Sequence, residues 1–226
     1  MHLDEDLARN KPAQQLLLWR RDYLRKHPLR VLRGFLDGVA DDQYRRIAQG
    51  IRGERAVARE LGAFLGRHPR WRVLHSIVVS ATGTDLDHLL IGPPGVYSIN
   101  TKHWSGRRIT GRSSTMRTTR ADGSARHGEV TTLRAARHEG DRVSRLLSTA
   151  VGLTVSARPV VAFVDPAEVR DELSAAGVRL LALDTFQSWF DAEDASPATF
   201  TSDEVATLYQ AARMPTTWLP VHSTRA

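Results

Sequence analysis

Acidic, amide and lysine side chains stand in two short segments of this chain, in a pattern that fits metal-dependent phosphodiester chemistry. Successive side chains of a β-strand point to opposite faces, so Asp85 and Asp87 share one face of a strand, and Asn100 and Lys102 share one face of the next. The chain has only three lysines beside twenty-nine arginines, which indicates that a compact ammonium is needed at Lys102. Carboxylates that hold a divalent ion next to a lysine can neutralise a scissile phosphate and activate a water.

A further carboxylate, Glu54, interrupts the apolar face of a predicted helix. Apolar residues spaced three and four apart predict this helix from about residue 41 to residue 65. A buried carboxylate costs free energy unless it is paired or binds a cation. Glu54 is therefore either a metal ligand or the partner of a neighbouring arginine such as Arg52 or Arg55.

The elements that must position these groups follow from periodicity and turn signals. Residues 1–40 have a helical pattern, which is clearest over residues 14–26. Further helical patterns cover residues 41–65, 131–149, 165–177, 185–191 and 202–213. Strand patterns cover residues 71–79, 85–91, 96–102, 159–164 and 178–183, and a hairpin is expected around residues 108–116, followed by a loop to residue 128. We therefore predict an N-terminal helical extension (1–45) and one α/β domain (46–226) with a mixed sheet flanked by helices.

Three sequence motifs resemble the nuclease-related domain (NERD) family, which is placed in the PD-(D/E)xK superfamily of restriction-like nucleases. They are Gly53-Glu54, the run GTDLDHLLIGP from Gly83, and the run GVYSINTK that ends at Lys102. The resemblance covers about residues 50–165 and implies a restriction-endonuclease-like fold, of helix, three-strand meander, helix and strand, that residues 166–226 complete. It implies that Glu54 is the acid of the first core helix, Asp87 the metal-binding aspartate and Lys102 the lysine of the motif.

Asn100 departs from that motif, which has Asp or Glu two residues before the lysine. An amide oxygen can bind a hard cation without supplying charge, so we expect Mg²⁺ or Mn²⁺ to be held by Glu54, Asp87 and Asn100. Asp85 lies on the right face to assist, and the resemblance makes Glu139 a further auxiliary candidate. We favour a nuclease that acts on DNA. A weakened or inactive nucleic-acid-binding module of the same fold and an interaction domain with a basic surface remain alternatives.

Positive charge is concentrated after the candidate site. Residues 101–145 hold eleven Lys or Arg against four acidic residues, a net charge of +7, which equals that of the whole chain. This segment predicts a phosphate-binding surface, whereas an arginine-rich surface set by codon usage is the alternative. The candidate DNA contacts are His103, Arg107, Arg108, Arg112 and Arg117.

Several function classes are excluded or disfavoured by composition. No apolar run approaches the roughly 18 residues that span a bilayer, so we expect no membrane partner. The acidic N-terminus is unlike a secretory signal. The absence of cysteine excludes thiolate metal sites and fits a cytoplasmic protein. Neither paired histidines for zinc nor a P-loop is present, and the oligomeric state is left open.

Overall fold

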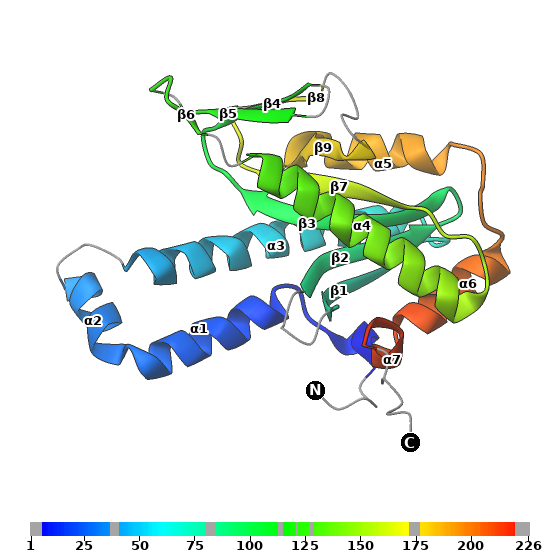
Figure 1. The fold of residues 1–226 in the computed structure, drawn as a ribbon, viewed down its shortest axis with the longest axis horizontal. Helices are drawn as coiled ribbons and strands as arrows, with labels where there is room; N and C mark the ends of the chain where they lie inside the picture. Colours follow the sequence, from blue (N-terminus) through cyan, green and yellow to red (C-terminus); the bar gives the residue numbers. More distant parts are fainter. Residues whose placement is uncertain are drawn as a thin grey trace.

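A computed structural model of the chain describes residues 6–36, 41–79, 85–112, 115–120, 122–126, 129–171 and 177–219. Its larger sheet has the strand order β1-β2-β3-β7-β9 (Figure 1). Strands β1 to β3 form the predicted antiparallel meander, whereas β7 runs parallel to β3 and β9 parallel to β7. The bounds are β1 Arg72–Val78, β2 Asp85–Gly92, β3 Gly95–His103, β7 Ala157–Val164 and β9 Arg179–Ala182. The predicted mixed sheet is therefore confirmed.

A second, smaller sheet has the order β6-β5-β4-β8. The predicted hairpin supplies its β4 and β5, and the strand bounds are β4 Arg108–Arg112, β5 Thr115–Thr119, β6 Ala125–Arg126 and β8 Glu168–Asp171. Parts of the loop expected up to residue 128 lie outside the described residues.

The helix expected from residue 165 is wrong over its first turns, where the chain forms strand β8. Asp165 has φ +53°, in the left-handed region, whereas a residue that caps a helix N-terminus is typically extended. Glu168 to Asp171 then pair in parallel with β4. The local capping pattern is present in the sequence, but the tertiary pairing overrides it, and residues 172–176 lie outside the described part of the chain.

Helices cover both faces of the larger sheet (Figure 1). On one face, α3 and α5 pack around Phe64, Tyr97 and Phe190, whereas on the other α4 and α6 pack around Leu89, Val96, Leu147 and Leu208. Their apolar stripes face the sheet, as helix periodicity requires. The bounds are α3 Asp42–Arg67, α4 Glu129–Val151, α5 Phe186–Asp194, α6 Ser202–Ala212 and α7 Pro215–Trp218, with short 3-10 turns at Leu7–Arg9 and Leu183–Thr185.

The N-terminal helices α1 (Gln14–Lys26) and α2 (Pro28–Leu36), together with the first turns of α3, form an arm that projects from the body (Figure 1). Asp41 joins the three helices. It caps α3 through the backbone N–H groups of Gln43 and Tyr44, accepts from the Tyr23 hydroxyl at 2.8 Å and pairs with Arg30 at 2.6 Å. We refer to residues 11–52 as the arm.

The turn between β2 and β3 depends on a close approach at Gly92, because a Cβ atom there would lie 2.2 Å from Cδ2 of the buried Trp71. We expect Gly92→Ala to destabilise the protein by about 2 kcal/mol or more, because either the indole or the turn must move. Gly62→Ala is the matched control, since its Cβ would meet nothing within 4 Å in the middle of α3. This control substitution should stabilise the protein by roughly 0.5–1 kcal/mol. Urea unfolding measures the free energy of unfolding of both variants. Equal changes in the two would show that Trp71 does not constrain Gly92.

Candidate functional site

Pairing of β2 with β3 places the predicted acidic and basic groups beside one another. The backbone N–H of Thr101 donates to Oδ2 of Asp87 at 2.6 Å, which holds this carboxylate against the neighbouring strand. Lys102 donates through Nζ to the amide oxygen of Asn100. The amide nitrogen of Asn100 in turn donates to both carboxylate oxygens of Glu139 on α4, at 3.1 and 3.3 Å. Both partners fix the orientation of the amide, since a carboxylate only accepts and an ammonium only donates.

Glu54 approaches from α3, on the opposite face of the sheet from α4. Its side chain is 4% exposed, and its Oε2 has no hydrogen-bond partner among the described residues. Gly53 allows the approach, because a Cβ there would lie only 3.2 Å from Cγ2 of Thr101 and Cβ of His103. The alternative of an arginine partner for Glu54 finds no support here, since Arg52 and Arg55 are exposed.

Burial raises the pKa of each candidate site carboxyl, and the charge of Asp87 raises the pKa of three of them further. Burial, followed by the charges of Asp87 and Asp85, raises the pKa of Glu54 to about 9. Burial and Asp87 likewise raise the pKa of Asp85 to about 6 and that of Glu139 to about 7. The pKa of Asp87 is also raised, chiefly by burial, and the ammonium of Lys102 lowers all four values. The lysine therefore does not balance the acidic groups that surround it.

A junction that sequence reasoning missed holds Glu54 from the N-terminal side. Ala13 and Ser76 both have left-handed backbones, with φ of +62° and +49°. Gln14 donates its backbone N–H to Oγ of Ser76 at 3.0 Å, and the side chain of Asn10 donates to the Ser76 carbonyl at 2.9 Å. A backbone hydrogen bond from Ala13 lowers the pKa of Glu54. No local signal marks these residues, because neither is a glycine and they are far apart in sequence.

The predicted DNA contacts divide into two groups. Arg108, Arg112 and Arg117 are exposed on β4 and β5, whose alternate residues Ile109, Gly111 and Met116 are buried. They share the outer face of the second sheet.

The other two candidates, His103 and Arg107, lie outside β4 and β5. His103 points away from Lys102, because the two are adjacent on β3, and its ring nitrogens lie 3.1 Å from the Gln49 carbonyl oxygen and 2.9 Å from Oδ2 of Asp165. The guanidinium of Arg107 lies over the Trp104 ring, 5.2 Å from its centre.

The described part of the chain lacks both a preformed group of metal ligands and a membrane-crossing helix. No group of three or more His, Asp or Glu side chains there is placed to hold a metal ion. None of the described helices is both long enough and apolar enough to cross a membrane.

A mixed sheet that brings helix and strand carboxylates to the lysine of a neighbouring strand defines the restriction-like class of nuclease fold. A family model described as the nuclease-related domain matches residues 49–164, just over half of the chain. The chain therefore belongs to the nuclease-related domain family, within the PD-(D/E)xK superfamily, and its function is nuclease-related. No curated protein and no solved structure matches it.

The raised pKa of Glu54 predicts a pH dependence of stability. Between its ordinary pKa of 4.5 and about 9, the folded protein keeps a proton that the unfolded chain releases. The free energy of unfolding must therefore fall as pH rises through this window. Glu54→Gln removes the cost of ionising this buried carboxyl. At pH 8 in EDTA, the free energy of unfolding of the variant should therefore exceed that of the wild type by on the order of 2 kcal/mol.

Thermal unfolding between pH 5 and 9 measures this difference. The exposed Asp141 on α4 provides a control, since Asp141→Asn should leave the pH dependence unchanged. A Glu54→Gln variant as pH-dependent as the wild type would show that Glu54 ionises normally.

Proposed function

We propose that this protein is a divalent-metal-dependent nuclease that hydrolyses phosphodiester bonds of DNA. One observation carries the proposal: carboxyls from α3, β2 and α4 lie around Lys102, where burial and then the charge of Asp87 raise the pKa of Glu54, Asp85 and Glu139. Such a concentration of unbalanced acid costs stability and is typical of a functional site. Membership of the nuclease-related domain family supports the reaction class.

Mg²⁺ or Mn²⁺ fits this group of residues. The unpartnered Oε2 of Glu54 and the mutual repulsion of the carboxyls are both relieved by a cation. Glu54 and Asp87 are the residues that would hold it, with Asp85 beside them. Bound there, a divalent ion supplies Lewis acidity and lowers the pKa of a coordinated water. Lys102 then orients the reacting phosphate and stabilises its charge in the transition state.

We propose for Asn100 a different role from that of the amide ligand that the sequence suggested. Its oxygen accepts from Lys102 and its nitrogen donates to Glu139, so the amide joins the lysine to a carboxylate of α4. A carboxylate at position 100 would face Glu139 and repel it. We therefore propose that Glu139 supplies the negative charge that Asn100 lacks, which supports a working variant of the motif.

DNA would approach through the outer face of the second sheet. Arg108, Arg112 and Arg117 present guanidinium groups on one side of β4 and β5, a geometry suited to phosphate contacts that do not depend on sequence. Along the chain, β3 leads from Lys102 to β4, so this face follows the candidate site directly in sequence. The neutral Asn100 favours the second candidate function, a nucleic-acid-binding module that does not cleave.

A cleavage assay separates the two candidates. With Mn²⁺ or Mg²⁺, we expect the wild type to cut DNA, and Asp87→Asn or Lys102→Ala to lower the rate by about 100-fold or more, because each removes charge stabilisation. Asp141→Asn, an exposed change on the same helix as Glu139, is the control and should retain activity. DNA binding that weakens with salt, with no cleavage by any form, would favour the binding module.

Metal binding tests the role of Glu139 without reference to activity. Calorimetry with Mn²⁺ should show about tenfold weaker binding for Glu139→Gln, because one acidic charge is lost. Adding Asn100→Glu to that variant should restore the affinity for Mn²⁺, since a carboxylate on β3 then replaces the one lost from α4. If Glu139→Gln binds Mn²⁺ as the wild type does, Glu139 does not serve the ion.

A further inference from the structure

The arm exposes apolar side chains that the rest of the molecule buries. Of the seven large hydrophobic side chains that the described residues expose, six lie on α1 and α2. Leu29 and Leu36 are each 78% exposed, Leu32 is 55% and Trp19 is 51% exposed. Soluble monomers rarely gather such side chains in one place unless the patch binds something.

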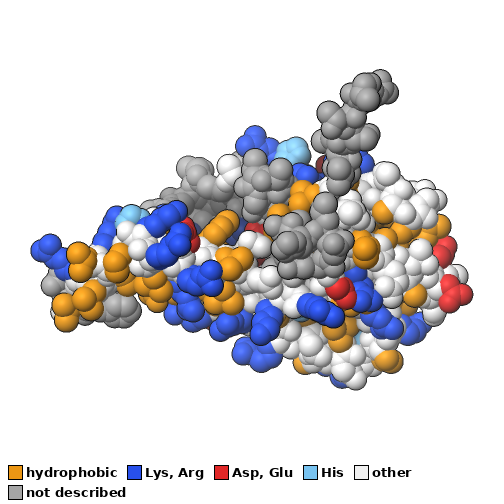
Figure 2. Space-filling model, turned by 90° about the horizontal axis from the view of Figure 1, so that it is seen from below, with side chains coloured by type: hydrophobic (Ala, Val, Ile, Leu, Met, Phe, Trp, Pro, Cys, Tyr) orange, Lys and Arg blue, Asp and Glu red, His pale blue; other side chains and the backbone are white. Residues whose placement is uncertain are grey.

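These side chains lie on the outward surface of the arm. Leu29, Leu32 and Leu36 are spaced three and four apart, so they share one face of α2, whereas Val31 on the opposite face is 5% exposed and packs inward. Figure 1 places α2 at the far end of the arm. Figure 2 shows hydrophobic side chains over this end, interspersed with Lys and Arg. The apolar face is therefore at the tip of a projection, where no other part of the described body covers it.

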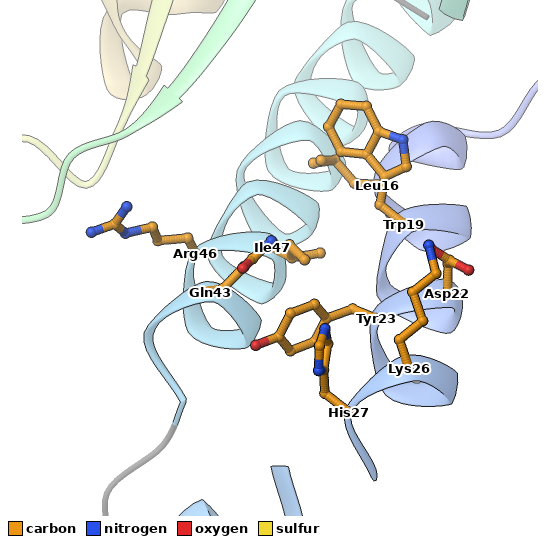
Figure 3. A pocket seen from close by; sticks show the side chains of 9 residues that line it. All are labelled: Leu16, Trp19, Asp22, Tyr23, Lys26, His27, Gln43, Arg46 and Ile47. Atoms are coloured by element: carbon orange, nitrogen blue, oxygen red, sulfur yellow. The ribbon is translucent and has the colours of Figure 1, made fainter. Parts of the chain in front are cut away.

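A hollow of about 540 Å³ between α1 and α3 adjoins this surface (Figure 3). Leu16, Trp19 and Ile47 supply its apolar lining, and Lys26 and Arg46 supply cations. Lys26 pairs with Asp22 of the same lining at 2.7 Å, and apolar and charged side chains are adjacent there.

Charge distinguishes between the possible occupants. Residues 11–52 hold ten Lys or Arg against four Asp and no Glu, a net charge of +6 within a chain whose total is +7. The side chains of Arg25, Lys26 and Arg30 are 81%, 62% and 66% exposed. Two such arms repel each other, which disfavours a second copy. Nucleic acid matches the charge but offers no apolar layer to exposed leucines.

We propose that the arm docks on the surface of an anionic lipid bilayer. The outward leucines of α2 and Trp19 enter the boundary between headgroups and acyl chains, and the surrounding cations contact the anionic headgroups. A helix that lies in the interface is physically distinct from one that spans it, so the lack of a membrane-crossing helix among those described is compatible with this contact. The sequence-based expectation of no membrane partner rests on the lack of a spanning segment, and the contact proposed here is with the membrane surface. The proposal does not depend on the nuclease activity.

Vesicle binding by the full chain tests the apolar part. We expect co-sedimentation with vesicles of phosphatidylcholine mixed with phosphatidylglycerol, and a blue shift of tryptophan emission that Trp19→Phe reduces. Leu29→Ser, Leu32→Ser and Leu36→Ser together should weaken binding about tenfold or more, since they remove the inserted side chains. Met214→Ser changes an exposed apolar residue outside the arm, 48% exposed, and should leave binding unchanged. Circular dichroism checks that the triple variant is folded, and single leucine variants replace it if it is not.

The contribution of positive charge to vesicle binding is tested with two double arginine variants, one in the arm and one in the body. Arg21→Gln with Arg25→Gln should weaken binding to the anionic vesicles, whereas Arg59→Gln with Arg145→Gln, which are also exposed but lie on the body, should not. Equal binding to vesicles of phosphatidylcholine alone, or binding to neither kind of vesicle, would overturn the proposal.

The remaining occupants are tested directly. A molecular mass that rises with protein concentration without lipid and falls in the triple leucine variant would assign the face to a second copy. A loss of DNA affinity caused by the same leucine changes would assign it to nucleic acid. Either result would overturn the lipid proposal.

Discussion

Repulsion among partly buried carboxyls is the constraint on which the site depends. Glu54, Asp85, Asp87 and Glu139 each have a raised pKa, and a single ammonium, Lys102, lies among them. The lysine attracts these carboxyls but does not balance them, because they lose hydration on burial and repel one another. The surrounding fold must therefore hold these side chains in place.

The fold holds them by using both of its helical layers. On one face of the sheet, Gly53 lets α3 approach β3 closely enough to bring Glu54 to the site. On the other face, Asn100 binds Glu139 of α4 through its amide nitrogen. The strained backbones of Ala13 and Ser76 add a third support next to Glu54. Left-handed conformations at non-glycine residues persist only where surrounding contacts enforce them, and here those contacts tie the N-terminal segment to β1.

The two positively charged regions of the chain occupy different places in the structure. The segment that follows Lys102 folds into the second sheet, where Arg108, Arg112 and Arg117 lie on one exposed face. The arm carries its charge together with exposed leucines and tryptophan. A polar basic face suits phosphate groups, whereas a mixed apolar and basic face suits a lipid surface. Similar composition thus leads to two kinds of surface because the neighbouring apolar residues are buried in one and exposed in the other.

The sequence by itself determined most of the local elements and indicated the candidate site residues. Strand alternation placed Asn100 and Lys102 on one face, helix periodicity placed Glu54 on a buried one, and the motifs indicated the family, because these signals depend only on neighbouring residues. Only the tertiary structure decided that residues 168–171 pair with β4 instead of forming a helix. It alone joined Asn100 to Glu139, placed the His103 ring against Gln49 and Asp165, and exposed the leucines of α2. Each of these outcomes depends on contacts between segments distant in the chain, and such contacts leave no periodic pattern in the sequence.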